Sequence, residues 1–129
     1  MLATRGRDTA PEWALRRAAH RLGLRYRVGA RPLKGIRRTG DLVFPRVRVV
    51  VFVDGCFWHG CPQHFQMPVQ NRAYWEPKIR GNARRDIETD AALRSAGWLS
   101  IRVWEHEDPS DAALQVAAAV ATRRNDEAR

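Results

Sequence analysis

The sequence predicts one α/β domain in which helices flank a mixed central sheet, and two observations lead to this architecture. The run at residues 47–53 is apolar and largely β-branched, which is typical of a buried strand, and Asp54-Gly55 marks its end. Helical patterns precede and follow this run, and another strand pattern separates the two later helices. A chain of 129 residues can bury such a core without disulfides.

The first helix is expected to follow a capping-box pattern, with Thr9 as the cap and Glu12 three residues on, and to end at Gly23. Residues 24–28 form a short strand candidate. Residues 31–39, which contain a proline and a glycine among basic side chains, indicate a connector to the next strand.

Residues 40–44 predict a strand, and Pro45-Arg46 predicts a tight turn into the run at residues 47–53. The two strands should therefore form an antiparallel hairpin. The hairpin would bring Asp41 and Asp54 toward the same end of the sheet. The glycine- and proline-containing stretch that follows, to about residue 72, indicates an irregular loop long enough to need a staple.

A long helix is expected to begin at about Tyr74 or Lys78 and to run through Ala96, with Gly97 as its stop signal. Its expected buried stripe is apolar and consists of Ile79, Ala83, Ile87 and Ala91.

Residues 98–104 predict a third core strand, and residues 108–111 begin a final helix rich in alanine and valine. We expect residues 123–129 to fray and residues 1–6 to form a short N-terminal arm.

The charge of the chain predicts a polyanionic partner. Lys and Arg number 23 against 14 acidic residues, a formal net charge of +9 carried mainly by arginine, which favours bidentate contacts to phosphate. The alternative is a basic surface that serves only solubility. No run is long and apolar enough for a membrane span or a signal peptide, so we expect a soluble, cytoplasmic protein that associates with the nucleoid.

Acidic and imidazole side chains near the hairpin end predict a magnesium-dependent nuclease site. Such a site needs oxygen ligands at a strand end and a base that activates water. Asp41 is the best magnesium ligand, with Asp54 at the same sheet end, and His59 is the candidate general base, which Asp86 could orient. The alternatives are an ordinary turn aspartate at position 41, solvated helix residues at Asn82 and Asp86, and zinc ligation by His59.

Cysteine and histidine cluster in the loop after the hairpin, which favours zinc over a disulfide in a reducing compartment. Cys56, Cys61 and His64 supply three ligands within nine residues, and His106 is our fourth. The alternative is two buried thiols and two surface histidines.

Large aromatic residues flank these groups. Phe57 and Trp58 lie between a candidate metal ligand and the candidate base, where they could wedge between DNA base steps, and Tyr74 and Trp75 could extend that surface. The alternative is packing of the rings into the protein core.

Taken together, these residues resemble the very-short-patch mismatch-repair (Vsr) endonuclease family, above all in the segment Val51-Phe52-Val53-Asp54-Gly55-Cys56-Phe57-Trp58-His59-Gly60-Cys61. The likeness covers the chain from about Arg5 to Glu107 and includes Arg7-Asp8-Thr9, Glu12, Asp41, Tyr74-Trp75, Lys78-Ile79, Asn82, Arg85-Asp86, Gly97-Trp98 and Val103-Trp104-Glu105. It implies a restriction-endonuclease-like sandwich with a zinc-stapled loop, and nicking of DNA beside T:G mismatches left by deamination of 5-methylcytosine.

For the magnesium site, the resemblance implies that Asp41 and the backbone carbonyl of Val53 coordinate the ion. It implies that His59 is the general base and that Asp86 orients it. Glu12, whose capping role competes for the same carboxylate, would hold metal-bound water together with Asn82.

For zinc, the resemblance implies ligation by Cys56, Cys61 and His106, with His64 replacing a ligand that is placed differently in the best-known members. It also implies that Phe57, Trp58 and Trp75 intercalate beside the mismatch.

The chain departs from the family pattern in two places near the site. The position of Asp54 is a histidine in the best-known members, and their Arg-Pro-Asp is Thr39-Gly40-Asp41 here. The segment that precedes Arg7 is also shorter than the usual basic arm, which bears on mismatch selectivity more than on nicking.

Three functions follow as hypotheses. The first is a magnesium-dependent, zinc-stabilised nickase, monomeric, that acts on mismatched double-stranded DNA with mismatch-repair proteins as candidate partners. The second is a related nickase in restriction or phage defence. The third is a non-catalytic DNA-binding module.

Overall fold

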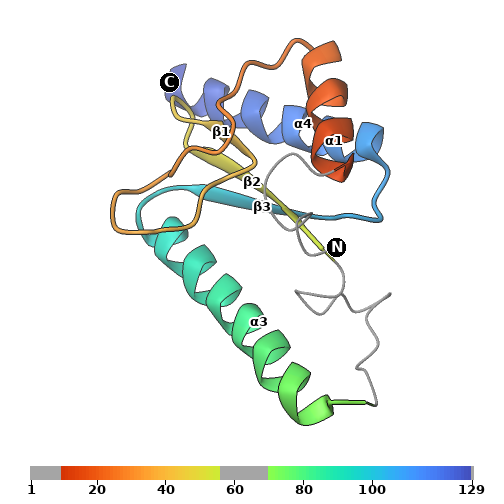
Figure 1. Ribbon diagram of the computed structural model, residues 1–129. Coiled ribbons are helices and arrows are strands. Elements are labelled where there is room, and N and C mark those ends of the chain that lie inside the picture. The colour runs from red at the N-terminus through yellow and green to blue at the C-terminus, as the bar shows by residue number, and fades with distance from the viewer. Residues whose placement is uncertain (1–9, 56–69, 129) are drawn as a thin grey trace.

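The computed structural model describes residues 10–55 and 70–128, with side chains through residue 126. The described elements lie in the order helix, two strands, helix, strand, helix (Figure 1): α1 (Ala10–Arg21), β1 (Leu42–Phe44), β2 (Val49–Asp54), α3 (Arg72–Ser95), β3 (Leu99–Trp104) and α4 (Pro109–Ala128). This order confirms the α/β arrangement that the sequence predicts.

The sheet is mixed, with the strand order β1-β2-β3. β1 pairs antiparallel with β2, with Leu42 opposite Val51, and β2 pairs parallel with β3, from Val49 opposite Leu99 to Asp54 opposite Trp104. The predicted hairpin is therefore confirmed. Residues 24–28 form no strand; the structure has only an isolated bridge there, between Arg27 and Val43.

Helices cover both faces of the sheet, with α1 and α4 side by side on one face and α3 on the other (Figure 1). Alternate side chains of a strand point to opposite faces, so the β-branched run of β2 supplies two cores. The larger core, between the sheet and the α1/α4 layer, includes Leu15, Ala19, Val49, Val51, Val116 and Val120. The smaller core faces α3 and consists of Val43, Val50, Phe52 and Leu93.

α1 ends at Arg21, and Gly23 is its stop signal, as predicted, because Gly23 adopts a left-handed conformation with φ of 83°. The Leu24 N–H donates to the Ala19 carbonyl at 3.2 Å and the Gly23 N–H to the His20 carbonyl at 2.9 Å, the Schellman pattern that satisfies the last turn. The cap at Thr9 lies outside the described residues.

α3 begins at Arg72, two residues before the earlier of the two expected starts, and its predicted apolar stripe is only partly confirmed. Ile87 is 70% exposed, whereas Ile79 and Leu93 are buried. The cause lies in the opposing strand: β3 presents Arg102 to this face, so α3 turns Asp86 and Asp90 toward the sheet instead of an apolar row.

α4 continues to Ala128, so the expectation that residues 123–128 fray is wrong. Arg123 holds this end of the helix, because its guanidinium donates to the backbone carbonyls of Val47, Arg48 and Gly97. These carbonyls belong to the hairpin turn and to the stop of α3, which the local sequence of the tail does not reveal. None of the described helices is long and apolar enough to cross a membrane.

Candidate active site

Asp41 makes hydrogen bonds with two residues of β2, Val51 and Val53. It lies one residue before β1, and its N–H donates to the Val51 carbonyl at 2.8 Å. Its Oδ2 accepts the backbone N–H of Val53 at 2.6 Å. In an antiparallel pair, the N–H of Val53 would ordinarily donate to a backbone carbonyl of the neighbouring strand. Here the Asp41 carboxylate accepts it instead, which holds the acid at the end of the hairpin.

Burial raises the pKa of Asp41 from 3.8 to about 6. The nearby carboxylates of Glu12 and Asp54 also raise this pKa, while the hydrogen bond from Val53 and the charge of Arg38 lower it. When burial and neighbouring acids disfavour the charged form of a carboxyl group, a nearby cation stabilises that charged form. Asp41 therefore has the properties of a cation-binding acid.

Glu12 joins this acidic group from α1. It is 7% exposed, and its Oε1 lies 3.5 Å from Nη2 of Arg16, which is one helical turn further on and also buried. The charge of Glu12 acts on Asp41, which places the Glu12 carboxylate near the end of the hairpin; its predicted role on metal-bound water stays a prediction.

Asp54, at the end of β2, is 2% exposed and binds two arginines. Nη1 of Arg102 lies 3.2 Å and 3.1 Å from its two carboxylate oxygens, and Nη2 of Arg38 lies 3.4 Å from Oδ1. A buried carboxylate needs such partners, since an unpaired one is costly. The predicted magnesium ligation by Asp54 stays a prediction, and any ion there would share Asp54 with two guanidinium groups.

The same arginines contact α3. Arg38 Nη1 donates to Asp86 Oδ1 at 2.8 Å, and Arg102 Nη1 lies 3.4 Å from that oxygen. Arg102 also contacts Asp90, with Nη2 to Oδ1 at 2.8 Å. We call Arg38, Asp54, Asp86, Asp90 and Arg102 the arginine–aspartate cluster; it joins the connector, β2, β3 and α3.

Phe52 forms the apolar floor of this cluster. Its ring is 1% exposed, and the guanidinium carbons of Arg102 and Arg38 lie 4.3 Å and 5.0 Å from its centroid. Burial alone would lower the pKa of Arg102, but the hydrogen bond to Asp90 and the charges of Asp54 and Asp86 raise it overall. Arg102 is therefore always protonated, and it orders the aspartates around it.

Asn82 lies on α3 one turn before Asp86, and its Oδ1 accepts a hydrogen bond from Arg85 Nη2 at 2.6 Å. Trp75 is half-buried, near the start of the same helix, and packs edge-to-face on the exposed Tyr74 with ring centroids 5.0 Å apart. Neither observation tests the roles predicted for Asn82 and Trp75, which stay predictions.

Most of the predicted zinc and base residues cannot be placed. Cys56, Phe57, Trp58, His59, Cys61 and His64 lie outside the described residues. His106, the fourth predicted zinc ligand, is exposed and lies just after β3. Within the described ranges, no group of three or more His, Cys, Asp or Glu side chains is arranged to hold a metal ion.

Arg38 and Arg102 are the site residues that the sequence analysis missed. Arg102 carried a signal, because a charge in the middle of a predicted core strand requires buried partners, and Asp86 and Asp90 follow helical spacing. Arg38 carried none, since it is one basic residue among several in a connector.

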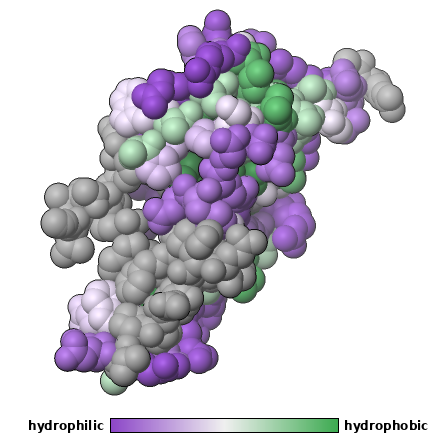
Figure 2. All heavy atoms as spheres, turned by 90° about the vertical axis from the view of Figure 1, so that its right-hand side faces the viewer, coloured by the Kyte–Doolittle hydropathy of each residue, from purple (hydrophilic) through white to green (hydrophobic). Residues whose placement is uncertain are grey.

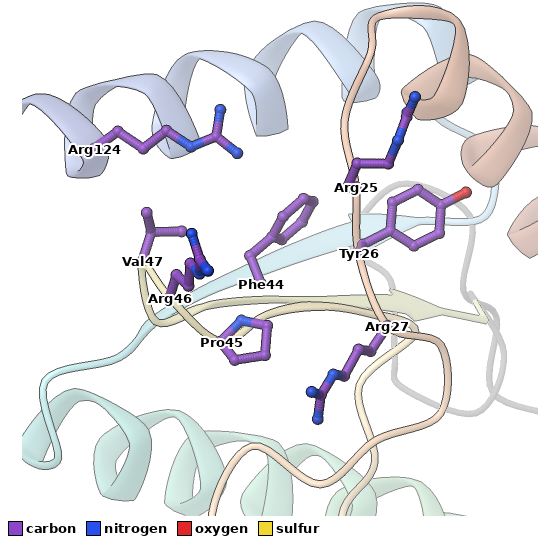
Figure 3. Close-up of a pocket in the computed structure, with 8 residues that line it drawn as sticks. All are labelled: Arg25, Tyr26, Arg27, Phe44, Pro45, Arg46, Val47 and Arg124. Atoms are coloured by element: carbon purple, nitrogen blue, oxygen red, sulfur yellow. The ribbon is translucent and has the colours of Figure 1, made fainter.

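The site lies at the end of the sheet away from the β1–β2 turn. A separate cavity of about 850 Å³ lies beside that turn (Figure 3), lined by Arg25, Tyr26, Arg27, Phe44, Pro45, Arg46, Val47 and Arg124. None of these eight lining residues is an acid or a histidine. Figure 2 views the molecule from the side on which β2 ends, and hydrophilic residues are spread from the top to the bottom of the coloured part of that face.

Comparison with known proteins decides the family. The family model described as DNA mismatch endonuclease Vsr matches residues 1–64. The type II nicking enzyme V.NaeI of Lentzea aerocolonigenes is 48% identical over 124 residues, which span 95% of this chain and 73% of the relative. The chain belongs to the Vsr family.

Two other relatives agree with this assignment. The type II nicking enzyme V.XorIIP of Xanthomonas oryzae pv. oryzae is 43% identical over 108 residues, covering 83% of this chain and 77% of the relative. The DNA mismatch endonuclease Vsr of Escherichia coli is 36% identical over 106 residues, covering 81% and 66%. As a Vsr family member, the chain is a DNA endonuclease with a mixed α/β fold, and the non-catalytic alternative has no support.

Proposed function

We propose that this Vsr family member is a magnesium-dependent endonuclease that nicks one DNA strand beside a T:G mismatch, in very-short-patch repair. The observation that carries the proposal is the Asp41 carboxylate, which accepts the Val53 N–H at 2.6 Å and is half-buried, with the charges of Glu12 and Asp54 acting on it. Nicking and mismatch recognition are supported by the names of the relatives, which are called nicking enzymes and, in one case, a mismatch endonuclease.

The donor set at the hairpin end fits a magnesium ion. Asp41 and the Val53 carbonyl would hold it, with Glu12 and Asn82 on its bound waters and Asp54 as a further candidate ligand. Magnesium keeps several waters and needs only one or two protein carboxylates, so a cage of three acids is not required. When bound, the ion would polarise a phosphoryl oxygen and offset the charge that develops during hydrolysis.

The protein supplies the proton transfer. We assign His59 as the general base that takes a proton from the attacking water, and Asp86 as the acid that orients its imidazole. Asp86 is well suited to this, because its side chain is only 14% exposed and Arg38 fixes one of its oxygens. A fixed carboxylate holds an imidazole in one orientation.

The loop between β2 and α3 would complete the domain. We propose a structural zinc bound by Cys56, Cys61, His64 and His106, and a restriction-endonuclease-like sandwich in which this loop is the stapled segment. Phe57, Trp58 and Trp75 would intercalate beside the mismatch. The enzyme would act as a monomer on double-stranded DNA, with mismatch-repair proteins as partners.

A second candidate function has its own support. Relatives such as V.NaeI and V.XorIIP are named type II nicking enzymes, so the substrate could instead be DNA that is tied to a restriction system. The two functions differ in the duplex that is cut fastest.

The deciding experiment is a nicking assay on duplexes of otherwise identical sequence that carry a T:G mismatch, a fully paired site or 5-methylcytosine. Each duplex is tested with magnesium and with EDTA. The repair function predicts fast nicking of T:G only, and none in EDTA. Equal nicking of paired DNA would contradict mismatch repair, and undiminished nicking in EDTA would contradict the metal requirement.

A further inference from the structure

The acids of the site create a problem for the substrate. The charges of Glu12 and Asp54 both act on Asp41 at the end of the hairpin, and Asp86 joins Asp54 through a shared arginine. A DNA phosphate that enters this region carries negative charge and gains more during hydrolysis. Cations of the protein that face the phosphate would offset this charge together with any bound metal.

Arg102 is unsuited to that role, because its donors are committed to the protein. Its Nη1 contacts both oxygens of Asp54, its Nε and Nη2 contact Asp90, and Nη2 also reaches the backbone carbonyl of Asp86 at 3.5 Å. Its side chain is 17% exposed. Arg102 thus holds Asp54, Asp86 and Asp90 in place from within the protein.

Arg38 differs in each of these respects. A guanidinium group carries five N–H donors, and the described contacts of Arg38 use Nη1 for Asp86 and Nη2 for Asp54. Donors remain for a ligand, and the side chain is 32% exposed, nearly twice the 17% of Arg102. Arg38 also precedes Asp41 by only three residues, so the connector carries the cation and the acid to the same place.

We propose that Arg38 is a catalytic residue that donates hydrogen bonds to a non-bridging oxygen of the scissile phosphate. Asp54, Asp86 and the Phe52 ring hold its guanidinium in place, and Arg102 is a positioning residue that holds these acids. This inference rests on the endonuclease site proposed at Asp41, and it adds a phosphate contact that neither the acids nor His59 provide.

The step is hydrolysis, and Arg38 keeps its proton throughout. The water oxygen bonds to phosphorus while the P–O bond to the departing strand end breaks. The water proton goes to His59, and the departing oxygen takes a proton from solvent. Arg38 offsets the charge on the phosphoryl oxygens as that exchange occurs.

The first test compares variants that remove one charge from the connector. Single-turnover nicking by Arg38→Gln at saturating duplex should be ~10²–10³-fold slower than wild type, the usual cost of one transition-state donor. Arg38→Lys should recover part of the rate because it keeps the charge. Arg37→Gln is the matched control, since Arg37 is the exposed neighbour and contacts no residue of the cluster among those described; it should stay near the wild-type rate. Equal rates for Arg38→Gln and Arg37→Gln would overturn the assignment.

The second test separates direct contact from an effect through Asp86 and His59. Duplexes with Rp or Sp phosphorothioate at the nicked linkage replace one non-bridging oxygen by sulfur. If Arg38 contacts that oxygen, one diastereomer slows wild type but adds little to the loss in Arg38→Gln. Additive losses with both diastereomers, together with a shifted pH–rate profile, would show that Arg38 only orders Asp86 and would overturn the proposal.

Two controls keep the outcomes distinct. Thermal melting and near-ultraviolet circular dichroism check that Arg38→Gln is folded; if it is not, the diastereomer comparison on Arg38→Lys decides. A wild type that nicks no duplex would overturn the proposed function and this assignment together, whereas loss of the Arg38 effect alone leaves the proposed function intact.

Discussion

The Oδ2 atom of Asp41 accepts the backbone N–H of Val53 at 2.6 Å, so an acid that precedes one strand is bonded near the end of the next. This bond places the carboxylate beside Val53, the residue whose carbonyl we propose as the second magnesium ligand. The first two predictions concern this carboxylate.

Asp41→Asn should abolish nicking, by ~10³-fold or more, because the amide keeps the shape and can still accept the Val53 N–H but loses the charge that attracts a divalent ion. Single-turnover nicking of a T:G duplex measures the effect, with Asp111→Asn as the control because Asp111 is exposed at the start of α4. Wild-type activity in Asp41→Asn would remove Asp41 from the metal site.

The metal-free enzyme should lose stability as pH rises through the titration of Asp41. Its pKa is 3.8 when unfolded and about 6 when folded, so the folded state binds more protons between these values. Stability from this group is therefore full below about pH 4 and is lost as pH approaches 6. Urea unfolding of wild type and Asp41→Asn at several pH values should show the variant gaining about 3 kcal/mol relative to wild type by pH 7. A difference that is independent of pH would contradict the raised pKa.

Arg102→Leu should destabilise the protein by about 3–5 kcal/mol, because it leaves the buried Asp54 without its main partner. Adding Asp54→Asn to that variant should restore part of the loss, since the unpaired charge is removed. Arg80→Leu is the comparison: its ion pair with Glu76 is exposed, and it should cost less than about 1 kcal/mol. Chemical denaturation measures the free energy of unfolding of all three variants. A similar loss of stability in Arg102→Leu and Arg80→Leu would contradict the stabilising role of the arginine–aspartate cluster.

Gly40→Ala should destabilise the hairpin by about 1–3 kcal/mol. A Cβ at position 40 would lie 2.8 Å from Val43 Cγ2 and closer still to Val50 Cγ2, so both strands would have to move, and Asp41 with them. Gly35→Ala serves as the control, because a Cβ there meets nothing within 4 Å. Nicking should fall in Gly40→Ala and not in Gly35→Ala. An unchanged melting temperature of Gly40→Ala would contradict the close packing of Val43 and Val50 around position 40.

The purified protein should contain one zinc ion, and Cys61→Ser should lose it and melt at a lower temperature. Elemental analysis with thermal melting measures both. His20→Ala is the control, since His20 is exposed on α1 and lies outside the proposed ligand set. A zinc-free wild type of full stability would exclude the structural site.

Local sequence was sufficient for the three strands of the sheet and for the ends of α1 and α3, but it wrongly predicted a strand at residues 24–28 and fraying at the end of α4. The β-branched run at β2, the Pro45-Arg46 turn and the stop signal at Gly23 act through backbone preferences and nearest neighbours, which any short segment carries with it. The same holds for the position of Asp41 and Asp54 at one end of the hairpin, because pairing of adjacent strands settles it.

Tertiary structure decided what the acids bind. The inner face of α3 follows from a charge on β3, which is why Asp86 and Asp90 are turned inward and Ile87 outward. Arg38 reaches Asp86 across 48 positions of the chain. A buried charge pairs with whichever opposite charge the fold brings near it, and helical or strand periodicity records only whether a residue is apolar. The position of Arg102 in a core strand indicated that it needs buried partners, but spacing does not predict the contact between Arg38 and Asp86.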